Sequence, residues 1–414
     1  MVARDPLAGS ASSLNVCVIG DGGGAHVRSR VDALASCVDG VHLLTPRASD
    51  LTTVTETVVE NSEAATFETF RRWRDVISSC AGDVVHIQYA SSWGAWVFAL
   101  MNDPRPMVLT VMGGDVLFNE QSKPHPLARW LTRCVLDRAN VITAKTDHLA
   151  SSMVALGVDE QKIARLVWGI DTDIFSPGDK ATARSSIGVD ADALVVFSPR
   201  MLNPFYNIDV MIRAVAKVRA IFPNVQLLLS EYEAQAGYRQ ELESLAKDLG
   251  VADVVTFVGS LTPDEMAKYY RASDVAVGLP PSDGFPQTVF EAMSCGTVNV
   301  VTPLDRYAEF IDDGETAIYA APDPDTLSEK LMMLFSDPGM RAQIADAGIQ
   351  KMTEIPNLND SAREIANVMG DARARSVGQP LNPLRRWMGW LILLGLSMRP
   401  QMTLSARPID AAKE

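Results

Sequence analysis

The sequence predicts an α/β protein with two parallel-sheet domains. Its 414 residues are too many for one hydrophobic core and suit two domains of ordinary size. Short apolar runs rich in valine, isoleucine and leucine alternate with stretches of helical periodicity, a pattern typical of parallel sheets covered by helices on both faces. The alternation occurs twice, on either side of Pro177-Gly178-Asp179, which we interpret as the interdomain linker.

The first domain is expected to span residues 14–177. Its predicted strands are the apolar runs 14–19, 41–46, 83–89, 106–115 and 140–143. Between them a helix is expected to open at Ala25, and a second, amphipathic segment holds Phe70 and Trp73. Residues 1 to about 13 are interpreted as a disordered leader, and they lack the charged and then apolar pattern of a signal peptide.

The second domain is expected to span residues 178–357. Strands are predicted near 194–198, 225–229, 254–258, 275–279 and 298–301, and the run 207–218 has helical periodicity. A helix at 358–373 is interpreted as returning to the first domain. Residues 374–414 form a tail that contains a short apolar segment.

Composition excludes several classes of function. The formal charge of −14 provides no basic stripe for phosphates, so no nucleic-acid partner is expected. The five cysteines are scattered and form no CxxC pair, which favours reduced thiols in a cytoplasm over a disulfide framework or a zinc site. The five histidines are equally scattered, and no metal or other cofactor is expected.

The stretch 275–301 predicts a strand, a loop, a helix and a further strand. Its loop leaves free backbone N–H groups at a helix N-terminus, where the positive end of the helix dipole favours a phosphate. Asp283 lies at the start of this helix, and Glu291 lies more than one turn further on. The two carboxylates can therefore contact different parts of one ligand. The alternative is a helix cap and a solvated glutamate, and spacing alone does not separate the two.

A glycine-rich turn follows the first predicted strand. Gly22, Gly23 and Gly24 would let a ligand approach the backbone closely at the start of a helix. A dinucleotide site is the alternative, but the spacing does not give GxGxxG and no acidic strand end follows.

The run Asp283-Gly284-Phe285-Pro286, followed by Phe290-Glu291-Ala292-Met293-Ser294-Cys295-Gly296, resembles the signature of the family-4 retaining glycosyltransferases. The resemblance covers about residues 14–372. It implies the GT-B fold, in which two Rossmann-like domains face each other across a cleft. It also implies a metal-independent transfer of a hexose from a nucleotide sugar to a glycan or lipid-linked hydroxyl acceptor.

The resemblance implies a role for each matching position. Arg200 would stabilise the departing phosphate, Glu291 would bind the ribose, and the turn Val258–Leu261 would stack on the nucleobase. Asp283 and the backbone of Gly284, Phe285, Pro286 and Gln287 would hold the sugar. Asp115, in a Gly113-Gly114-Asp115 loop, would contact the acceptor and the transferred sugar, or else cap a helix. Gly22, Gly23 and Gly24 would border the cleft.

The chain departs from the family pattern at several positions. Tyr206 stands where a lysine is usual, so a positive charge at the diphosphate is lost. His26, Arg28 or Lys145 would have to replace that charge, or else the enzyme is slower or has another activity. Met112 replaces a histidine, Asp305-Arg306-Tyr307 replaces a pair of glycines, and Ser230-Glu231-Tyr232 replaces a glycine-rich turn.

The tail holds an apolar run, Trp387–Leu396, behind two arginines. It is shorter than the roughly 20 residues that span a bilayer. Its tryptophans and arginines fit a segment lying on a membrane, and they equally fit a helix packed on the body or on a partner subunit.

The sequence as a whole therefore predicts a cytoplasmic hexosyltransferase, either free or at the inner face of the plasma membrane. Two other functions stay open. One is a nucleotide-sugar hydrolase or epimerase on the same fold, and the other is a non-catalytic binding or scaffolding subunit.

Overall fold

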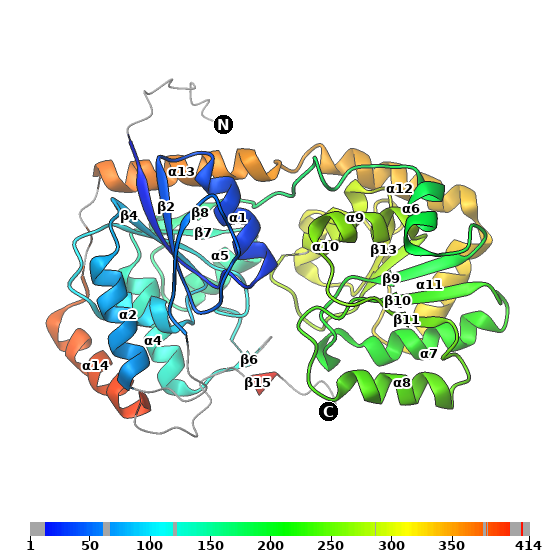
Figure 1. Cartoon of the computed structure of the whole chain (residues 1–414), viewed down its shortest axis with the longest axis horizontal. Helices are drawn as coiled ribbons and strands as arrows, with labels where there is room; N and C mark the ends of the chain where they lie inside the picture. Colours follow the sequence, from blue (N-terminus) through cyan, green and yellow to red (C-terminus); the bar gives the residue numbers. More distant parts are fainter. Residues whose placement is uncertain are drawn as a thin grey trace. The chain divides into compact units, whose positions relative to one another are not determined.

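The chain divides into two units by its internal contacts. The computed structural model describes residues 13–60, 67–118, 122–285, 287–375, 378, 380–397 and 407–408, so the expected leader lies almost entirely outside the described residues (Figure 1). Unit 1 comprises residues up to Phe118, then Pro124–Leu166 and Asn359–Arg407. Unit 2 comprises Asn119–Lys123, Val167–Leu358 and the residues from Pro408 onward.

Unit 1 contains a parallel sheet in the order β3-β2-β1-β4-β5-β7-β8. Its strands are β1 (Asn15–Ile19), β2 (Gly40–Thr45), β3 (Thr55–Val58), β4 (Val84–Gln88), β5 (Met107–Thr110), β7 (Val141–Ala144) and β8 (Ile163–Arg165). Strand β4 is buried along its whole length, as expected for a sheet covered on both faces. Strands β2 and β3 lie on one side of β1, and the later strands of the chain, from β4 onward, lie on the other. The topological switch point of the sheet is therefore between β1 and β4.

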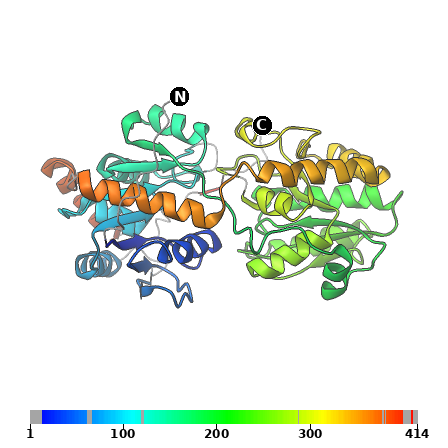
Figure 2. The same ribbon diagram turned by 90° about the horizontal axis from the view of Figure 1, so that it is seen from above.

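Helices lie on both faces of the unit 1 sheet (Figures 1 and 2). They are α1 (Ala25–Ala35), α2 (Phe67–Ser79), α3 (Trp93–Leu100), α4 (Pro126–Arg138), α5 (Asp147–Ala155), α13 (Leu358–Arg375) and α14 (Pro383–Ser397). Ser92 and Thr146 cap α3 and α5 by accepting hydrogen bonds from backbone amides of the first turn. Helix α14 packs against α2 and α3.

Unit 2 contains a second parallel sheet, in the order β11-β10-β9-β12-β13-β14. Its strands are β9 (Leu194–Ser198), β10 (Val225–Leu229), β11 (Val255–Phe257), β12 (Val275–Gly278), β13 (Val298–Val301) and β14 (Ile318–Tyr319). Its helices are α6 (Lys180–Ile187), α7 (Ile208–Arg219), α8 (Tyr238–Asp248), α9 (Pro263–Ala272), α10 (Gln287–Ser294), α11 (Pro324–Ser336) and α12 (Pro338–Met352). In chain order this is the 3-2-1-4-5-6 arrangement of a Rossmann fold, with its switch point between β9 and β12.

Short elements complete the chain. Among the described residues, 3₁₀ turns cover Glu160–Lys162, Pro204–Tyr206 and Asp305–Glu309. Two short strands, β6 (Ser122–Lys123) and β15 (Arg407–Pro408), pair with each other outside the two large sheets. No helix in the described part of the chain is long and apolar enough to cross a bilayer.

The segment that was expected to close the first domain packs instead with unit 2. Ile170 and Phe175 lie in the core that covers one face of the unit 2 sheet. Ile170 also forms a β-bridge with Asn357, and its carbonyl accepts a hydrogen bond of 2.8 Å from the amide of Leu358. Gly169 is required at this point, because a Cβ there would lie 1.6 Å from the carbonyl oxygen of Pro356.

A candidate site at the switch point of unit 2

The switch point of unit 2 brings together two loops that are distant in sequence. Strands β9 and β12 are neighbours and parallel, so their carboxyl ends lie at the same edge of the sheet. Arg200 follows β9, and the loop Ser282–Phe285 follows β12 and leads into α10. Ligands of open parallel sheets bind outside the strand ends at such a point.

Arg200 is fixed by three side chains. Its Nη2 lies 2.9 Å from Oδ2 of Asp283, and its Nη1 donates a hydrogen bond of 2.9 Å to Oγ1 of Thr288. Its guanidinium carbon stands 4.5 Å from the ring centroid of Tyr206. Burial lowers the pKa of Arg200, but the charge of Asp283 outweighs this effect and holds the pKa above its usual range. The guanidinium is therefore charged, oriented and only 11% exposed.

The loop that carries Asp283 is held by residues of the Asp305–Glu309 turn. The hydroxyl of Tyr307 donates a hydrogen bond of 2.9 Å to Oδ2 of Asp283. Nη1 of Arg306 donates to the carbonyl of Asp283 at 2.7 Å and to Oγ of Ser282 at 3.1 Å. Two residues that replace the usual glycines thus stabilise the loop and add an arginine to the site.

Helix α10 places Glu291 beside this network. Oε2 of Glu291 accepts a hydrogen bond of 3.1 Å from the hydroxyl of Tyr270, in α9. Burial raises the pKa of Glu291 to about 8, although the Tyr270 hydrogen bond and the charge of Arg200 act in the opposite direction. The solvated glutamate considered above is therefore wrong, because this carboxyl is partly buried and bonded.

The other predicted positions of this site differ in their surroundings. Gln287, the first residue of α10, is buried, and its amide Nε2 donates to the carbonyl of Gly169 at 3.2 Å. Gly284 and Phe285 are also buried, while Leu261 is partly buried against the same core. Pro286 lies outside the described residues.

The turn after β10, which lacks the family's glycines, is stabilised by Glu231. Its backbone amide donates to the carbonyl of Gly259 at 2.9 Å, and its Oε2 accepts from the amide of Gly259 at 3.0 Å. Its Oε1 pairs with Arg239 at 2.5 Å. The turns after β10 and β11 are therefore joined to each other beside the site.

In unit 1, the glycine-rich turn lies at the carboxyl end of β1. The amide of Gly22 donates to Oγ1 of Thr45 at 2.8 Å, and a Cβ on Gly22 would lie 2.8 Å from that of Ser49. Gly23 lies under an ion pair between Asp21 and Arg47 of 2.6 Å. Gly24 precedes α1 as its N-cap. Close packing therefore explains the absence of side chains at Gly22 and Gly23.

Asp115 is buried in unit 1 and accepts backbone hydrogen bonds from two loops. Its Oδ2 accepts from the amide of Ala90 at 2.8 Å, and its Oδ1 accepts from Met112 at 3.0 Å and Gly113 at 2.9 Å. Burial raises the pKa of this carboxyl, although the amide contacts act in the opposite direction. Asp115 lies in a turn and caps no helix, so that alternative is wrong. Its oxygens face the protein backbone and bind the ends of β4 and β5 to each other.

Further side chains lie near Asp115, and of these Tyr89 and Arg30 were not singled out from the sequence. Tyr89, which follows β4 at the switch point, has a φ of 89°, a conformation that is strained for a residue with a side chain. Met112, at the position of the family's histidine, receives Nη1 of Arg30 at 2.9 Å and Nζ of Lys145 at 3.7 Å on its sulfur. Both cations are buried in unit 1. A strained φ cannot be read from a sequence, which gives no signal for Tyr89.

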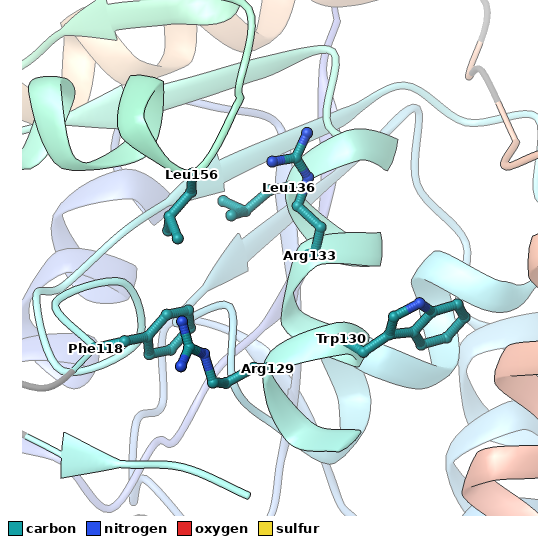
Figure 3. Close-up of a pocket in the computed structure, with 6 residues that line it drawn as sticks. All are labelled: Phe118, Arg129, Trp130, Arg133, Leu136 and Leu156. Atoms are coloured by element: carbon teal, nitrogen blue, oxygen red, sulfur yellow. The ribbon is translucent and has the colours of Figure 1, made fainter. Parts of the chain in front are cut away.

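A hollow of about 220 Å³ lies elsewhere on unit 1 (Figure 3). It is lined by Phe118, Arg129, Trp130, Arg133, Leu136 and Leu156, none of which was predicted as a site residue. Arg129 stacks on Phe118 with 5.1 Å between guanidinium carbon and ring centroid. Within the described residues, no three histidine, cysteine, aspartate or glutamate side chains gather in an arrangement that could hold a metal ion.

Comparison with known proteins identifies the family. The family model described as Glycosyl transferases group 1 matches residues 179–351, and the model described as Glycosyltransferase Family 4 matches residues 20–174. The chain belongs to the glycosyltransferases that these two models describe. Each model matches the body of one unit, so both units carry the resemblance that was inferred from the motif around Asp283 and Glu291.

Two relatives give the extent of the similarity. The D-inositol 3-phosphate glycosyltransferase 2 of Catenulispora acidiphila is 32% identical over 63% of this chain and 62% of its own length. The D-inositol 3-phosphate glycosyltransferase of Acidothermus cellulolyticus is 29% identical over 73% of this chain and 68% of its own. The match to the Catenulispora relative thus covers less than two thirds of its length.

Two solved structures share the fold of this chain. Sucrose-phosphate synthase from Thermosynechococcus elongatus has a TM-score of 0.75 at 19% identity, covering 87% of this chain and 100% of its own. The Anabaena protein HepE, solved with UDP and glucose, has a TM-score of 0.73 at 16% identity. The match covers 86% of this chain and 100% of the HepE chain. The family's two-domain GT-B fold is thereby confirmed, and at these identities the comparison concerns the fold alone.

Proposed function

We propose that this protein is a retaining hexosyltransferase that moves a sugar from a nucleotide sugar to a hydroxyl acceptor. One observation carries the proposal. The switch point of unit 2 holds a charged arginine, Arg200, next to an acidic loop and a partly buried glutamate on a helix. A nucleoside diphosphate sugar offers the matching groups, which are a diphosphate, a sugar and a ribose.

In the proposed complex each group has one role. Arg200 stabilises the negative charge that develops on the departing diphosphate, the type of contact that usually makes the largest contribution to catalysis. Asp283 and the backbone of Gly284–Gln287 hold the sugar, Glu291 binds the ribose, and the turn Val258–Leu261 borders the nucleobase. No metal ion is required, since the guanidinium and the helix N-terminus supply the positive charge.

The reaction exchanges one bond for another on the same face of the sugar. The bond from the anomeric carbon to the diphosphate oxygen breaks, and a bond from that carbon to the acceptor oxygen forms. The acceptor proton passes to the leaving phosphate, so no separate base is needed. The turn of Gly22, Gly23 and Gly24 and the loop positioned by Asp115 would contribute the acceptor side.

Arg306 is our candidate for the positive charge that is missing at Tyr206. It belongs to unit 2, and its Nη1 already lies 2.7 Å from the backbone of Asp283. Tyr206 itself stacks on Arg200 and supplies no charge. A second arginine within the same loop network explains how the tyrosine is tolerated.

The named substrates of related proteins suggest where to begin. Two relatives are named for D-inositol 3-phosphate, and HepE was solved with UDP and glucose. We therefore expect a nucleotide sugar such as UDP-glucose as donor and a glycan, a lipid-linked sugar or a phosphorylated polyol as acceptor. The five free thiols fit a protein that works in the cytoplasm.

The first experiment is a thermal-shift screen against UDP, GDP, ADP and their hexose conjugates without metal. A ligand at a hundred times its Kd adds about 2.7 kcal/mol of apparent stability, which is a shift of several degrees. We expect one nucleotide sugar to shift wild type but not Glu291→Ala. No shift with any of them would favour the non-catalytic subunit, and release of free sugar from donor alone would favour a hydrolase.

A further inference from the structure

The outer face of helix α14 carries a stripe of exposed apolar side chains. Leu384, Trp387, Met388 and Leu391, here called the α14 stripe, are 64%, 60%, 42% and 49% exposed. Their spacing of three, four and seven residues places them on one side of the helix. The described part of the chain exposes nine large hydrophobic side chains, so nearly half of them lie on this single helix.

The opposite face of α14 is anchored to unit 1, which fixes the orientation of the stripe. Leu393 is fully buried, and the ring of Trp390 meets that of Phe70 edge-on with 4.8 Å between centroids. A Cβ on Gly389 would lie 2.3 Å from a methyl of Leu100, so the helix lies directly on α3. The stripe is the face that α14 leaves uncovered when its other face is packed.

The stripe lies in a basic region of an acidic protein. Helices α14 and α2, which pack together, carry five arginines and only two carboxylates, whereas the whole chain has a formal charge of −14. The arginines are Arg71, Arg72, Arg74, Arg385 and Arg386, and the carboxylates are Glu68 and Asp75. Arg385 is paired with Asp137 of α4 at 2.6 Å. Arg72 and Arg74 are paired with the two carboxylates of α2, so Arg71 and Arg386 supply the excess of positive charge. The excess of positive charge beside apolar side chains matches an anionic lipid surface.

We propose that the α14 stripe docks this protein on an anionic lipid bilayer, with α14 lying in the plane of the interface. The 15-residue helix is about 22 Å long and does not reach across a bilayer of about 30 Å. Trp387 and the neighbouring arginines are the residue types that membrane interfaces favour. Four side chains expose an area on the order of a few hundred Å², less than the roughly 800 Å² per partner of a stable protein interface.

The experiment is a flotation assay of the full chain with lipid vesicles. Vesicles of phosphatidylcholine and phosphatidylglycerol are compared with pure phosphatidylcholine, each at low and at high salt. The stripe variant is Trp387→Ser with Leu391→Ser. The matched control is Ile221→Ser with Leu249→Ser, two exposed apolar positions of unit 2 that are 63% and 38% exposed. Circular dichroism checks that all variants are folded.

We expect wild type and control to float with anionic vesicles, more weakly at high salt, and the stripe variant to bind at least tenfold more weakly. Brominated lipid should quench the fluorescence of wild type, and Trp387→Phe should bind yet lose most of that quenching. Equal binding to neutral vesicles, no flotation, or flotation of the stripe variant like wild type overturns the proposal. If wild type does not float but forms a dimer that the stripe variant cannot form, the proposal is overturned, and the stripe instead binds a second copy of this chain. None of these readouts depends on the transferase reaction.

Discussion

The guanidinium of Arg200 lies between the carboxylate of Asp283, 2.9 Å away, and the ring of Tyr206, whose centroid is 4.5 Å away. The ion pair is nearly buried, with the two side chains 11% and 13% exposed. Thr288 and Tyr307 complete the hydrogen bonds of this pair. These contacts hold the side chains of the site in place, so substitutions among them should affect both stability and activity.

Replacing Arg200 by alanine should lower turnover by about two to three orders of magnitude, because the departing diphosphate loses its stabilising charge. It should also cost about 3–5 kcal/mol of stability, since Asp283 would be left buried and unpaired. Steady-state kinetics and urea unfolding measure the two effects. Arg219→Ala, which breaks an exposed pair with Asp253, is the control and should change neither by much. Unchanged turnover in Arg200→Ala would refute the assignment.

At Tyr206 the ring, and not the hydroxyl, should matter. The hydroxyl makes a weak hydrogen bond to the sulfur of Met201, at 3.8 Å, whereas the ring stacks on Arg200. We expect Tyr206→Phe to keep kcat/KM within about twofold and Tyr206→Ala to lower it by about 5- to 30-fold, the equivalent of one cation–π contact. If the phenylalanine variant were as impaired as the alanine variant, the hydroxyl would have to contact the substrate.

Replacing Arg306 by glutamine should weaken donor binding. The neutral side chain can still donate a hydrogen bond to the backbone of Asp283, so the loop should keep its conformation while the positive charge is lost. We expect the KM for the nucleotide sugar to rise about tenfold, with a smaller change in KM for the acceptor. Equal changes in both constants would indicate that Arg306 only supports the loop.

Replacing Asp115 by asparagine should destabilise the protein by about 2–4 kcal/mol. The carboxylate accepts three backbone amides, and the amide nitrogen of asparagine cannot accept any of them. Urea unfolding measures the loss, and Asp190→Asn at an exposed position is the control. If stability were unchanged and turnover fell steeply, Asp115 would act on the substrate directly.

Glu291 should make stability depend on pH. Its pKa rises from 4.5 to about 8 on folding, so the folded protein holds a proton that the unfolded chain releases between these values. Stability should therefore fall as pH rises from about 4.5 to about 8 and then level off. The glutamine of Glu291→Gln does not ionise, so this variant does not lose stability with rising pH at this position. It should be more stable than wild type by about 1–3 kcal/mol at pH 8.5, but not at pH 4.5. Parallel curves for the two proteins would contradict the raised pKa.

The strands could be predicted wherever a buried strand produced an apolar run. The predicted runs 194–198, 225–229 and 298–301 coincide with β9, β10 and β13. The strand predicted at 106–115 was too long, because only Met107–Thr110 is extended. Strands β3 and β8 were missed. They lie at the edges of the unit 1 sheet, are half exposed and have no apolar run to reveal them.

The site could be predicted less completely, because sequence spacing reveals only neighbours on the same element. Arg200, Asp283 and Glu291 were found from a family motif, and the structure brings the first two into contact. Their partners Tyr270 and Tyr307 were missed, since they lie on other elements and no periodicity links them. Asp115 illustrates a second limit. A ligand contact, a helix cap and a backbone tether all use a carboxylate after a glycine pair, and only coordinates distinguish them.

The main segment of unit 2, Val167–Leu358, is inserted in the sequence of unit 1, and the bridge between Ile170 and Asn357 joins its two ends. The chain arrives at Val167 and departs at Leu358, and these two ends run side by side and are hydrogen bonded to each other. A segment whose first and last residues are adjacent can be exchanged between homologous chains without stretching either junction. The segment Val167–Leu358 is therefore suited to building chimeras in which it is combined with the unit 1 of another chain.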